Sequence, residues 1–314
     1  ACGVVLLAVV MSCSDGLEPE GALTERPGAD VSSRWQGLVP GSPRVLDLRP
    51  DDLGSAPTLL TPGGTGVFFS ATNDSTGQEP WWSDGTEAGT ILLKDVLAGA
   101  SGSTPRAFTR LGASVIFSAV SGLWKSDGTV AGTTFITSIY PYLGTEGNGM
   151  AAMNGAVYFC ASSTDGSSPA LWKTDGTAAG TVMLKSFARG TFSTSIKWFT
   201  AVNNTLFFAM EEGATGDELW KSDGTAAGTL LVKDILSGSY SSNPRNLIQL
   251  NGKLYFTAND GKNGEELWRS DGTAAGTVMV KDLDTGPGVG SEPSQLTNVN
   301  GTLFFTTKQS STRQ

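Results

Sequence analysis

A segment of eleven residues that recurs along the chain constrains its fold more than any other feature. The sequence Leu-Trp-Lys-Ser-Asp-Gly-Thr-Ala-Ala-Gly-Thr at 219–229 returns with one change at 267–277, and shorter versions occur at 171–177, 123–129 and 81–86. The five Asp-Gly-Thr elements start at Asp84, Asp127, Asp175, Asp223 and Asp271, which gives spacings of 43, 48, 48 and 48 residues. A fixed period of this length indicates one structural unit repeated along the chain.

Each unit contains four strand-like pieces. The first ends at an Asn-Gly pair, as at 247–252, and the second is a short aromatic segment, as at 254–256. The third carries the Leu-Trp pair and ends in the Asp-Gly-Thr turn, and the fourth alternates apolar and polar residues, as at 230–235. Asn-Gly between two such segments is a strong signal for a β-hairpin, because both residues tolerate positive φ.

The predicted fold class is all-β, a β-propeller built from four-stranded blades. Four short antiparallel strands in about 48 residues match the size of one blade. Glycine accounts for 41 of the 314 residues, nearly twice the usual ~7%, which suits many tight turns and not a helical bundle. An all-β solenoid is the alternative, but solenoid repeats are commonly shorter and carry fewer aromatic residues.

The ends of the repeat region predict about six blades. Residues 45–48 match the fourth strand of a unit, and residues 295–305 match the first two strands. The chain therefore holds five full repeats plus one composite or incomplete blade, and strands from both ends would share that blade, as in other closed propellers. A fragment of a longer repeat array is the alternative.

The first residues indicate an export signal. Residues 3–11 form an apolar run that suits a signal peptide but is too short to span a membrane, and Val10-Met11-Ser12-Cys13 resembles a bacterial lipobox. We therefore predict a truncated signal peptide at 1–13 with lipidation at Cys13, a flexible linker at 14–43, the repeat domain at 44–308 and a tail at 309–314. The expected location is secreted or in the cell envelope, as a bacterial lipoprotein; plain secretion or a buried strand are the alternatives.

The core sequence Glu-Leu-Trp-Lys-Ser-Asp-Gly-Thr at 218–225 resembles the bacterial secreted proteins named for their ELWxxDGT repeats, some of which carry the label hyalin. The resemblance covers nearly all of residues 44–307. It implies a propeller-like, extracellular and often lipid-anchored protein. It implies no particular activity or ligand.

Composition excludes several kinds of chemistry. The chain has no histidine, which removes Ser-His-Asp and Cys-His catalysis and histidine-ligated metals. Its net charge of −9 disfavours binding to phosphate backbones, so no nucleic-acid partner is expected. Contact with a membrane is expected only through the N-terminal lipid. Without a visible acid pair, arginine cluster or P-loop, we predict that the protein is not an enzyme.

The repeated aspartates Asp84, Asp127, Asp175, Asp223 and Asp271 are predicted to be structural, because a catalytic centre is singular and these residues occur once in every unit. No cofactor is expected. The alternative is calcium in the loop that contains Asp260, Asn263 and Glu265, because clustered oxygen ligands among glycines suit this ion. Related loops carry Glu79 and Glu218.

Residues that differ between units are the better guide to binding. Tyr140, Tyr142 and Trp198 have no counterparts in the other repeats, and exposed aromatics beside polar residues stack on sugars or anchor proteins. The predicted function is therefore that of a non-enzymatic, monomeric propeller that binds a glycan or protein ligand through its blade loops, for adhesion, recognition or scaffolding. A glycan-active hydrolase using Glu211 or Glu212 is the alternative.

Overall fold

A computed structural model describes residue 48 and residues 54–143, 149–188, 196–213, 215–286 and 288–308. The chain divides into the units Ala1–Pro43 and Arg44–Gln314, and all described residues belong to the second. The predicted signal peptide with Cys13, the linker at 14–43 and the tail at 309–314 lie outside the described residues. No helix in the described part is long and apolar enough to cross a membrane.

The described chain is a succession of antiparallel sheets in which each strand pairs with the next in sequence. The first sheet contains β1 (Thr58–Gly63), β2 (Gly66–Asn73), β3 (Gly77–Ser83) and β4 (Thr90–Leu92). The second contains β5 (Arg106–Leu111), β6 (Ser114–Ala119), β7 (Gly122–Ser126) and β8 (Thr134–Thr137). The third contains β9 (Met150–Met153), β10 (Ala156–Ser162), β11 (Pro169–Thr174) and β12 (Val182–Ser186).

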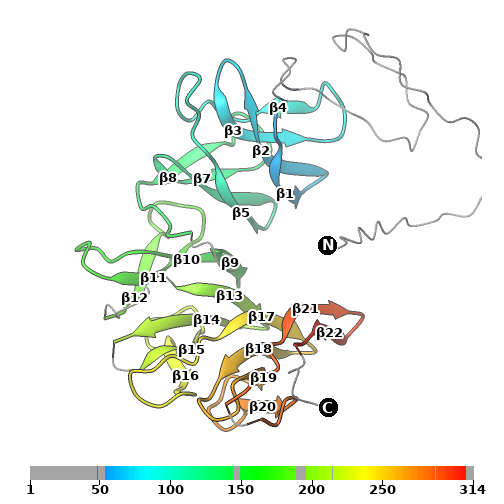
Figure 1. Cartoon of the computed structure of the whole chain (residues 1–314). Coiled ribbons are helices and arrows are strands. Elements are labelled where there is room, and N and C mark those ends of the chain that lie inside the picture. The colour runs from blue at the N-terminus through cyan, green and yellow to red at the C-terminus, as the bar shows by residue number, and fades with distance from the viewer. Residues whose placement is uncertain are drawn as a thin grey trace, which may run out of the picture. The chain divides into compact units, whose positions relative to one another are not determined.

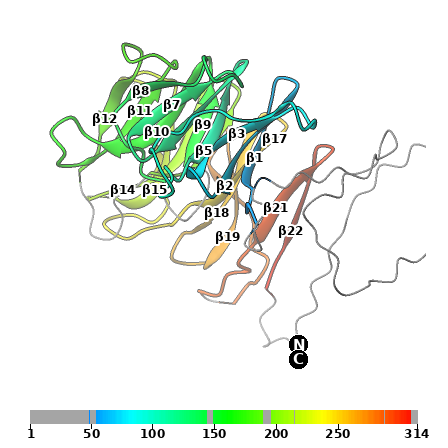
Figure 2. The ribbon, with the colours of Figure 1, turned by 90° about the horizontal axis from the view of Figure 1, so that it is seen from above.

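The remaining sheets follow the same plan. The fourth contains β13 (Lys197–Val202), β14 (Thr205–Glu212), β15 (Gly216–Ser222) and β16 (Leu230–Lys233). The fifth contains β17 (Arg245–Leu250), β18 (Lys253–Asn259), β19 (Glu265–Ser270) and β20 (Val278–Lys281). The sixth has two strands among the described residues, β21 (Ser294–Val299) and β22 (Thr302–Thr306). Figure 1 shows the sheets in this order, and Figure 2 shows the same strands from above.

The turns form where the sequence predicts them. Asn251 and Gly252 join β17 to β18 with φ of 50° and 75°, and Asn300 and Gly301 join β21 to β22 with φ of 50° and 81°. Two successive positive φ values define the type I′ turn, whose twist matches that of the flanking strands. Local sequence therefore sets these two hairpins.

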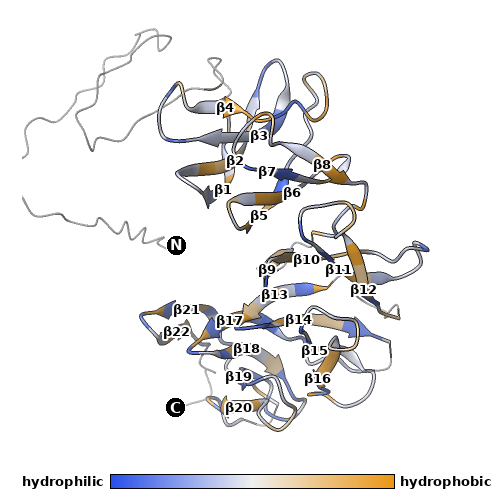
Figure 3. Ribbon diagram, turned by 180° about the vertical axis from the view of Figure 1, so that it is seen from behind, coloured by the Kyte–Doolittle hydropathy of each residue, from blue (hydrophilic) through white to orange (hydrophobic). Residues whose placement is uncertain are grey.

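The sheets stack through their aromatic strands. The first strands lie against one another in the order β1, β5, β9, β13, β17 and β21, and apolar clusters fill the space between successive sheets. Phe117, Phe159, Phe208 and Phe256, from four consecutive second strands, are fully buried there. Figure 3 shows that hydrophobic stretches recur along the strands. The prediction of an all-β propeller of four-stranded blades is confirmed: among the described residues five sheets have four strands and the sixth has two.

The Asp-Gly-Thr turns of the second to fifth blades each contact the blade before them. In the turn at 223–225 the carboxylate of Asp223 accepts hydrogen bonds from the backbone N–H and the hydroxyl of Thr225, at 2.8 and 2.7 Å. Gly224 packs against Tyr158 of the third blade, and its carbonyl accepts a 2.8 Å hydrogen bond from Lys173 of that blade. The turn chemistry is the same in all five copies. The five aspartate carboxylates therefore hold their own turns together.

A buried glutamate fastens the link between consecutive blades. The carboxylate of Glu218, on β15, accepts hydrogen bonds from the backbone N–H of Ile235 and from the hydroxyl of Ser242, at 2.9 and 2.6 Å. Glu79 and Glu266 accept the corresponding hydroxyl bonds from Ser103 and Ser291. Each of these glutamates is fully buried. Sequence reasoning grouped Glu79 and Glu218 with loop oxygens, whereas the structure gives them a structural role.

Candidate ligand site between the fourth and fifth blades

The first strand of five blades carries a β-bulge. The strand register shifts at this point in β1, β5, β13, β17 and β21. One residue in each bulge has a positive φ: Leu59, Ala107, Trp198, Asn246 and Gln295. Side chains other than glycine avoid this conformation, and it costs of order 1–3 kcal/mol. A bulge bends its strand and redirects side chains, so these positions shape the walls along the first strands.

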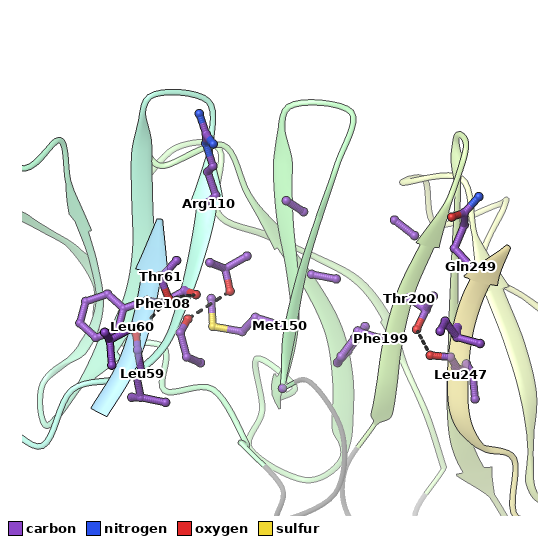
Figure 4. A pocket seen from close by; sticks show the side chains of 17 residues that line it. Leu59, Leu60, Thr61, Phe108, Arg110, Met150, Phe199, Thr200, Leu247 and Gln249 are labelled. Atoms are coloured by element: carbon purple, nitrogen blue, oxygen red, sulfur yellow. Dashed lines mark hydrogen bonds between the residues drawn. The ribbon is translucent and has the colours of Figure 1, made fainter. Parts of the chain in front are cut away.

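The first strands line a cavity of about 710 Å³, shown in Figure 4. Thr61 and Thr200 donate hydrogen bonds across it to the carbonyls of Phe108 and Leu247 on the next blades, at 3.4 and 3.2 Å. Each hydroxyl also lies within hydrogen-bond distance of the carbonyl two residues earlier in its own strand, Leu59 at 3.0 Å and Trp198 at 3.3 Å. The remaining wall is mostly backbone, alanine and aliphatic side chains, with Arg110 at one end. The cavity offers volume but few groups that could select a ligand.

A smaller pocket of about 280 Å³ lies between the fourth and fifth blades. Lys197 and Trp198 reach it from the bulge of β13, and Asp217 from the start of β15. Asn243 and Arg245 reach it from the segment that leads into β17. Trp198 also packs against the apolar cluster between these blades, which holds the indole in place. The pocket therefore combines an aromatic surface with four polar side chains of different chemistry.

The charges around this pocket are paired. Lys197 Nζ lies 3.7 Å from Asp217 Oδ2. Arg245 forms an ion pair with Glu265, and its Nε donates a 2.9 Å hydrogen bond to Glu265 Oε1. Both cationic side chains of the pocket therefore have an anionic partner, and the pocket suits a neutral, hydroxyl-rich ligand better than a charged one.

The structure separates the three aromatic residues singled out from sequence. Trp198 lines the pocket. Tyr140 is 44% exposed, before the third blade. Tyr142 packs against the apolar cluster between the third and fourth blades, and its hydroxyl is hydrogen-bonded to Ser162. The three side chains therefore do not form one surface.

The proposed calcium loop is held by its own hydrogen bonds. Asp260 Oδ1 accepts hydrogen bonds from the backbone N–H of Lys262 and Asn263, at 2.9 and 2.8 Å, and Oδ2 accepts one from the Asn263 side chain. The carboxylate of Glu265 is shared between Arg245 and the hydroxyl of Thr257. The carboxylates therefore already have protein donors. Calcium binding at Asp260, Asn263 and Glu265 stays a prediction.

Sequence reasoning identified Trp198 but not the polar residues that share its pocket. Lys197 and Arg245 occupy equivalent places just before the bulge residue, where other blades have Thr58, Arg106 and Ser294. They look like ordinary members of the repeat, so nothing in the sequence marks them. The signal that could have found the site is Trp198 itself, an aromatic residue where the other bulges have Leu59, Ala107, Asn246 or Gln295.

The fold and its inter-blade pocket define a protein of the β-propeller class. No protein-family model and no curated protein sequence matches the chain. Similar solved structures include a nidogen/laminin complex (TM-score 0.36, 12% identity, 66% of this chain and 72% of that chain). They also include a puromycin hydrolase mutant (TM-score 0.44, 14% identity, 71% and 39%) and a putative TolB from Agrobacterium tumefaciens (TM-score 0.37, 10% identity, 63% and 67%).

The comparison corrects one sequence-based prediction. We expected that the chain is not an enzyme, and this expectation is contradicted because puromycin hydrolase, the tricorn protease and an isopeptidase are among the similar structures. The chain spans 39% of the puromycin hydrolase chain and 24% of the tricorn protease chain. At this level of identity the likeness concerns the fold and names no reaction for this protein.

Proposed function

We propose that this propeller binds a neutral glycan in the pocket between its fourth and fifth blades. The observation that carries the proposal is Trp198, the one aromatic residue among the five bulge positions, which lines a pocket with Lys197, Asp217, Asn243 and Arg245. Trp198 has a strained backbone conformation with φ of 59°. Such a conformation persists only where the surrounding residues hold it in place.

The chemistry of the pocket matches that of a sugar ring. The apolar face of a hexose packs on an aromatic ring, while its hydroxyls need donors and acceptors around the rim. Here Lys197 and Arg245 can donate, Asp217 can accept, and the Asn243 amide can do both. The volume of about 280 Å³ is at the small end of ligand pockets, which suits one sugar unit of a longer chain.

A glycan array followed by titration calorimetry tests this proposal. We expect Trp198→Ala to weaken binding of the best glycan at least tenfold, and Asn243→Ala to weaken it severalfold, while Tyr140→Ala leaves it unchanged. Circular dichroism and thermal melting check that each variant is folded. Binding that survives Trp198→Ala, or that is lost with Tyr140→Ala, would place the ligand elsewhere and refute the proposal.

A second function, hydrolysis of the bound glycan, is favoured by one observation. Glu211 on β14 lies directly opposite Asp217 on β15, and both are largely buried, with 4% and 6% exposure. Opposite residues on antiparallel strands point to the same face. Glycosidases use a pair of carboxylates, and Asp217 of this pair lines the pocket. Release of reducing ends from the bound glycan, abolished by Glu211→Gln without loss of binding, would establish this activity.

A further inference from the structure

An exposed tyrosine lies close to the pocket between the fourth and fifth blades. Tyr240 is 73% exposed, more than any other large apolar side chain among the described residues. It belongs to the segment that joins β16 to β17, three residues before Asn243, which lines the pocket. Three residues of chain span at most about 11 Å, so the backbone of Tyr240 lies no farther than this from that of Asn243.

The pocket and this segment lie at the same end of the fourth blade. Its four strands pair antiparallel in sequence order. The first and third strands of such a sheet therefore begin at the end where the second and fourth strands finish. Lys197 and Trp198 are at the beginning of β13, Asp217 is at the beginning of β15, and the segment with Tyr240 leaves the end of β16. A ligand in the pocket therefore meets the end of the blade that carries Tyr240.

Backbone contacts fix the segment of Tyr240 against the strand that carries Asp217. The N–H of Asp217 donates a 2.9 Å hydrogen bond to the hydroxyl of Ser241, and the N–H of Asn243 donates one to the carbonyl of Asp217 at 3.2 Å. A side chain at Gly216, where φ is 66°, would start 2.2 Å from the carbonyl oxygen of Tyr240. The two backbones therefore approach each other directly, and Tyr240 is held beside the acidic residue of the pocket.

The buried carboxylate of Glu218 anchors both ends of the segment. It accepts hydrogen bonds from the backbone N–H of Ile235 and of Ser242, at 2.9 and 3.0 Å, and from the Ser242 hydroxyl at 2.6 Å. Within the segment the N–H of Gly238 donates to the carboxylate of Asp234 at 3.4 Å. A loop that is already ordered loses little conformational freedom when a ligand binds, which favours binding.

The fold of the segment does not require an aromatic residue. Three blades have a serine whose hydroxyl binds a buried glutamate, and the residue two places earlier differs among them. The serines are Ser103, Ser242 and Ser291, and the earlier residues are Ser101, Tyr240 and Val289. A ring that is mostly in water adds little to the packing of the blade. It does offer an apolar face with a polar tip, which is the chemistry of a contact surface.

We propose that Tyr240 forms a second subsite, which stacks on the sugar unit next to the one held at Trp198. The ligand is then a chain of neutral sugars bound along at least two adjacent units, and not a single sugar. The second subsite rests on the proposed function, the binding of a neutral glycan at Trp198. Residues 235–244 contain no charged side chain, so this edge of the pocket offers a charged polymer no partner.

A size series of one glycan tests the second subsite. The probe is the neutral glycan that binds best on the array, prepared as fragments of one, two, three and four units. Titration calorimetry measures the longer fragments, and saturation-transfer NMR measures the single unit. We expect the unchanged protein to bind the four-unit fragment about tenfold more tightly than the single unit, or more. Tyr240→Ala should remove most of this gain and leave the affinity for the single unit unchanged.

Matched variants separate stacking from other effects of the substitution. Tyr240→Phe keeps the ring and should keep the gain. Val289→Ala changes the equivalent residue of the fifth blade, which is also exposed, and should have no effect on any fragment. Trp198→Ala should weaken the binding of fragments of every length. Thermal melting checks that each variant is folded.

The outcomes distinguish failure of the second subsite from failure of the proposed function. A lack of binding to every neutral glycan, or binding that ignores Trp198→Ala, would refute both. Binding that needs Trp198 but keeps its full dependence on length in Tyr240→Ala would overturn the second subsite alone, as would equal affinities for one and four units. A polypeptide that binds through Tyr240, while Tyr240→Ala leaves the glycan series unchanged, would assign the tyrosine to protein recognition and overturn it too.

Discussion

The fourth and sixth blades begin with the same hairpin and end in different surroundings. In β13–β14 Thr200 lies opposite Phe207 and Val202 opposite Thr205. In β21–β22 Thr297 lies opposite Phe304 and Val299 opposite Thr302, with the same bulge before them. Yet Phe207 and Val202 are 2% and 4% exposed, against 57% and 46% for Phe304 and Val299. Hairpin geometry is therefore local, whereas burial of the same residues depends on a third strand and on the next blade.

The largest expected effect is the loss of the aromatic ring from the complete blade. Phe207→Ala should lower the free energy of unfolding by about 3–5 kcal/mol, because it leaves a cavity in a packed interface. Phe304→Ala should lower it by about 1 kcal/mol or less, since its ring is mostly in water. Urea unfolding followed by tryptophan fluorescence measures both. Equal losses would mean that the sixth blade is as well packed in solution as the fourth.

The second expected effect is a dependence of stability on pH. It comes from the buried carboxylate of Glu218 in the fourth blade, which has no counterpart in the described part of the sixth. Burial raises the pKa of Glu218 to about 7, although hydrogen bonds from Ser242 and the backbone lower it. The folded state then holds a proton that the unfolded state releases above about pH 4.5. This contribution to stability is complete below pH 4.5 and is lost as the pH rises through 7. Burial raises the pKa of Glu79 in the same sense.

We therefore expect the free energy of unfolding to fall between pH 4.5 and 8, by on the order of 3 kcal/mol for Glu218. Below that window the trend reverses, because hydrogen bonds from Thr225 lower the pKa of the Asp223 carboxylate, so its protonation in acid costs stability. Urea unfolding at a series of pH values checks the trend, and Glu218→Gln should flatten the upper part. An unchanged slope in that variant would assign the dependence to other groups.

The third effect compares two glycines with the same backbone conformation. Gly224 and Gly85 have φ of 91° and 87°, so alanine is strained at both, by about 1–2 kcal/mol. An added methyl group at Gly224 would lie 2.4 Å from the Tyr158 hydroxyl, whereas at Gly85 it meets nothing. Gly224→Ala should therefore cost about 1–3 kcal/mol more than Gly85→Ala. Similar losses in chemical denaturation would show that the first blade is also covered in solution.

Much of the fold could be predicted from the sequence, because its signals are local and repeated. Asn251-Gly252 defines a hairpin, Asp223-Gly224-Thr225 defines a turn, and both recur at regular intervals. The pairing of Glu218 with Ser242 could not be foreseen, since the two residues are 24 positions apart and the glutamate resembles a solvent-exposed charge. In the same way Trp198 stood out from the repeat, but the pocket around it comes from the packing of two blades.

The smallest expected effect is the difference between two serines in equivalent places, Ser242 and Ser55. Each is followed by a residue with positive φ and then by proline. Ser242 is fully buried, and its hydroxyl donates a 2.6 Å hydrogen bond to Glu218, so Ser242→Ala leaves a buried carboxylate short of one donor. Its cost should be about 1–3 kcal/mol. Ser55 is half-buried and lines a cavity of about 570 Å³ beside the first blade, so Ser55→Ala should change the free energy of unfolding by about 0.5 kcal/mol or less. Thermal and urea unfolding of both variants measure the difference. A cost at Ser55 equal to that at Ser242 would mean that the Ser55 hydroxyl also bonds a buried acceptor in solution, which would remove the contrast between the two serines.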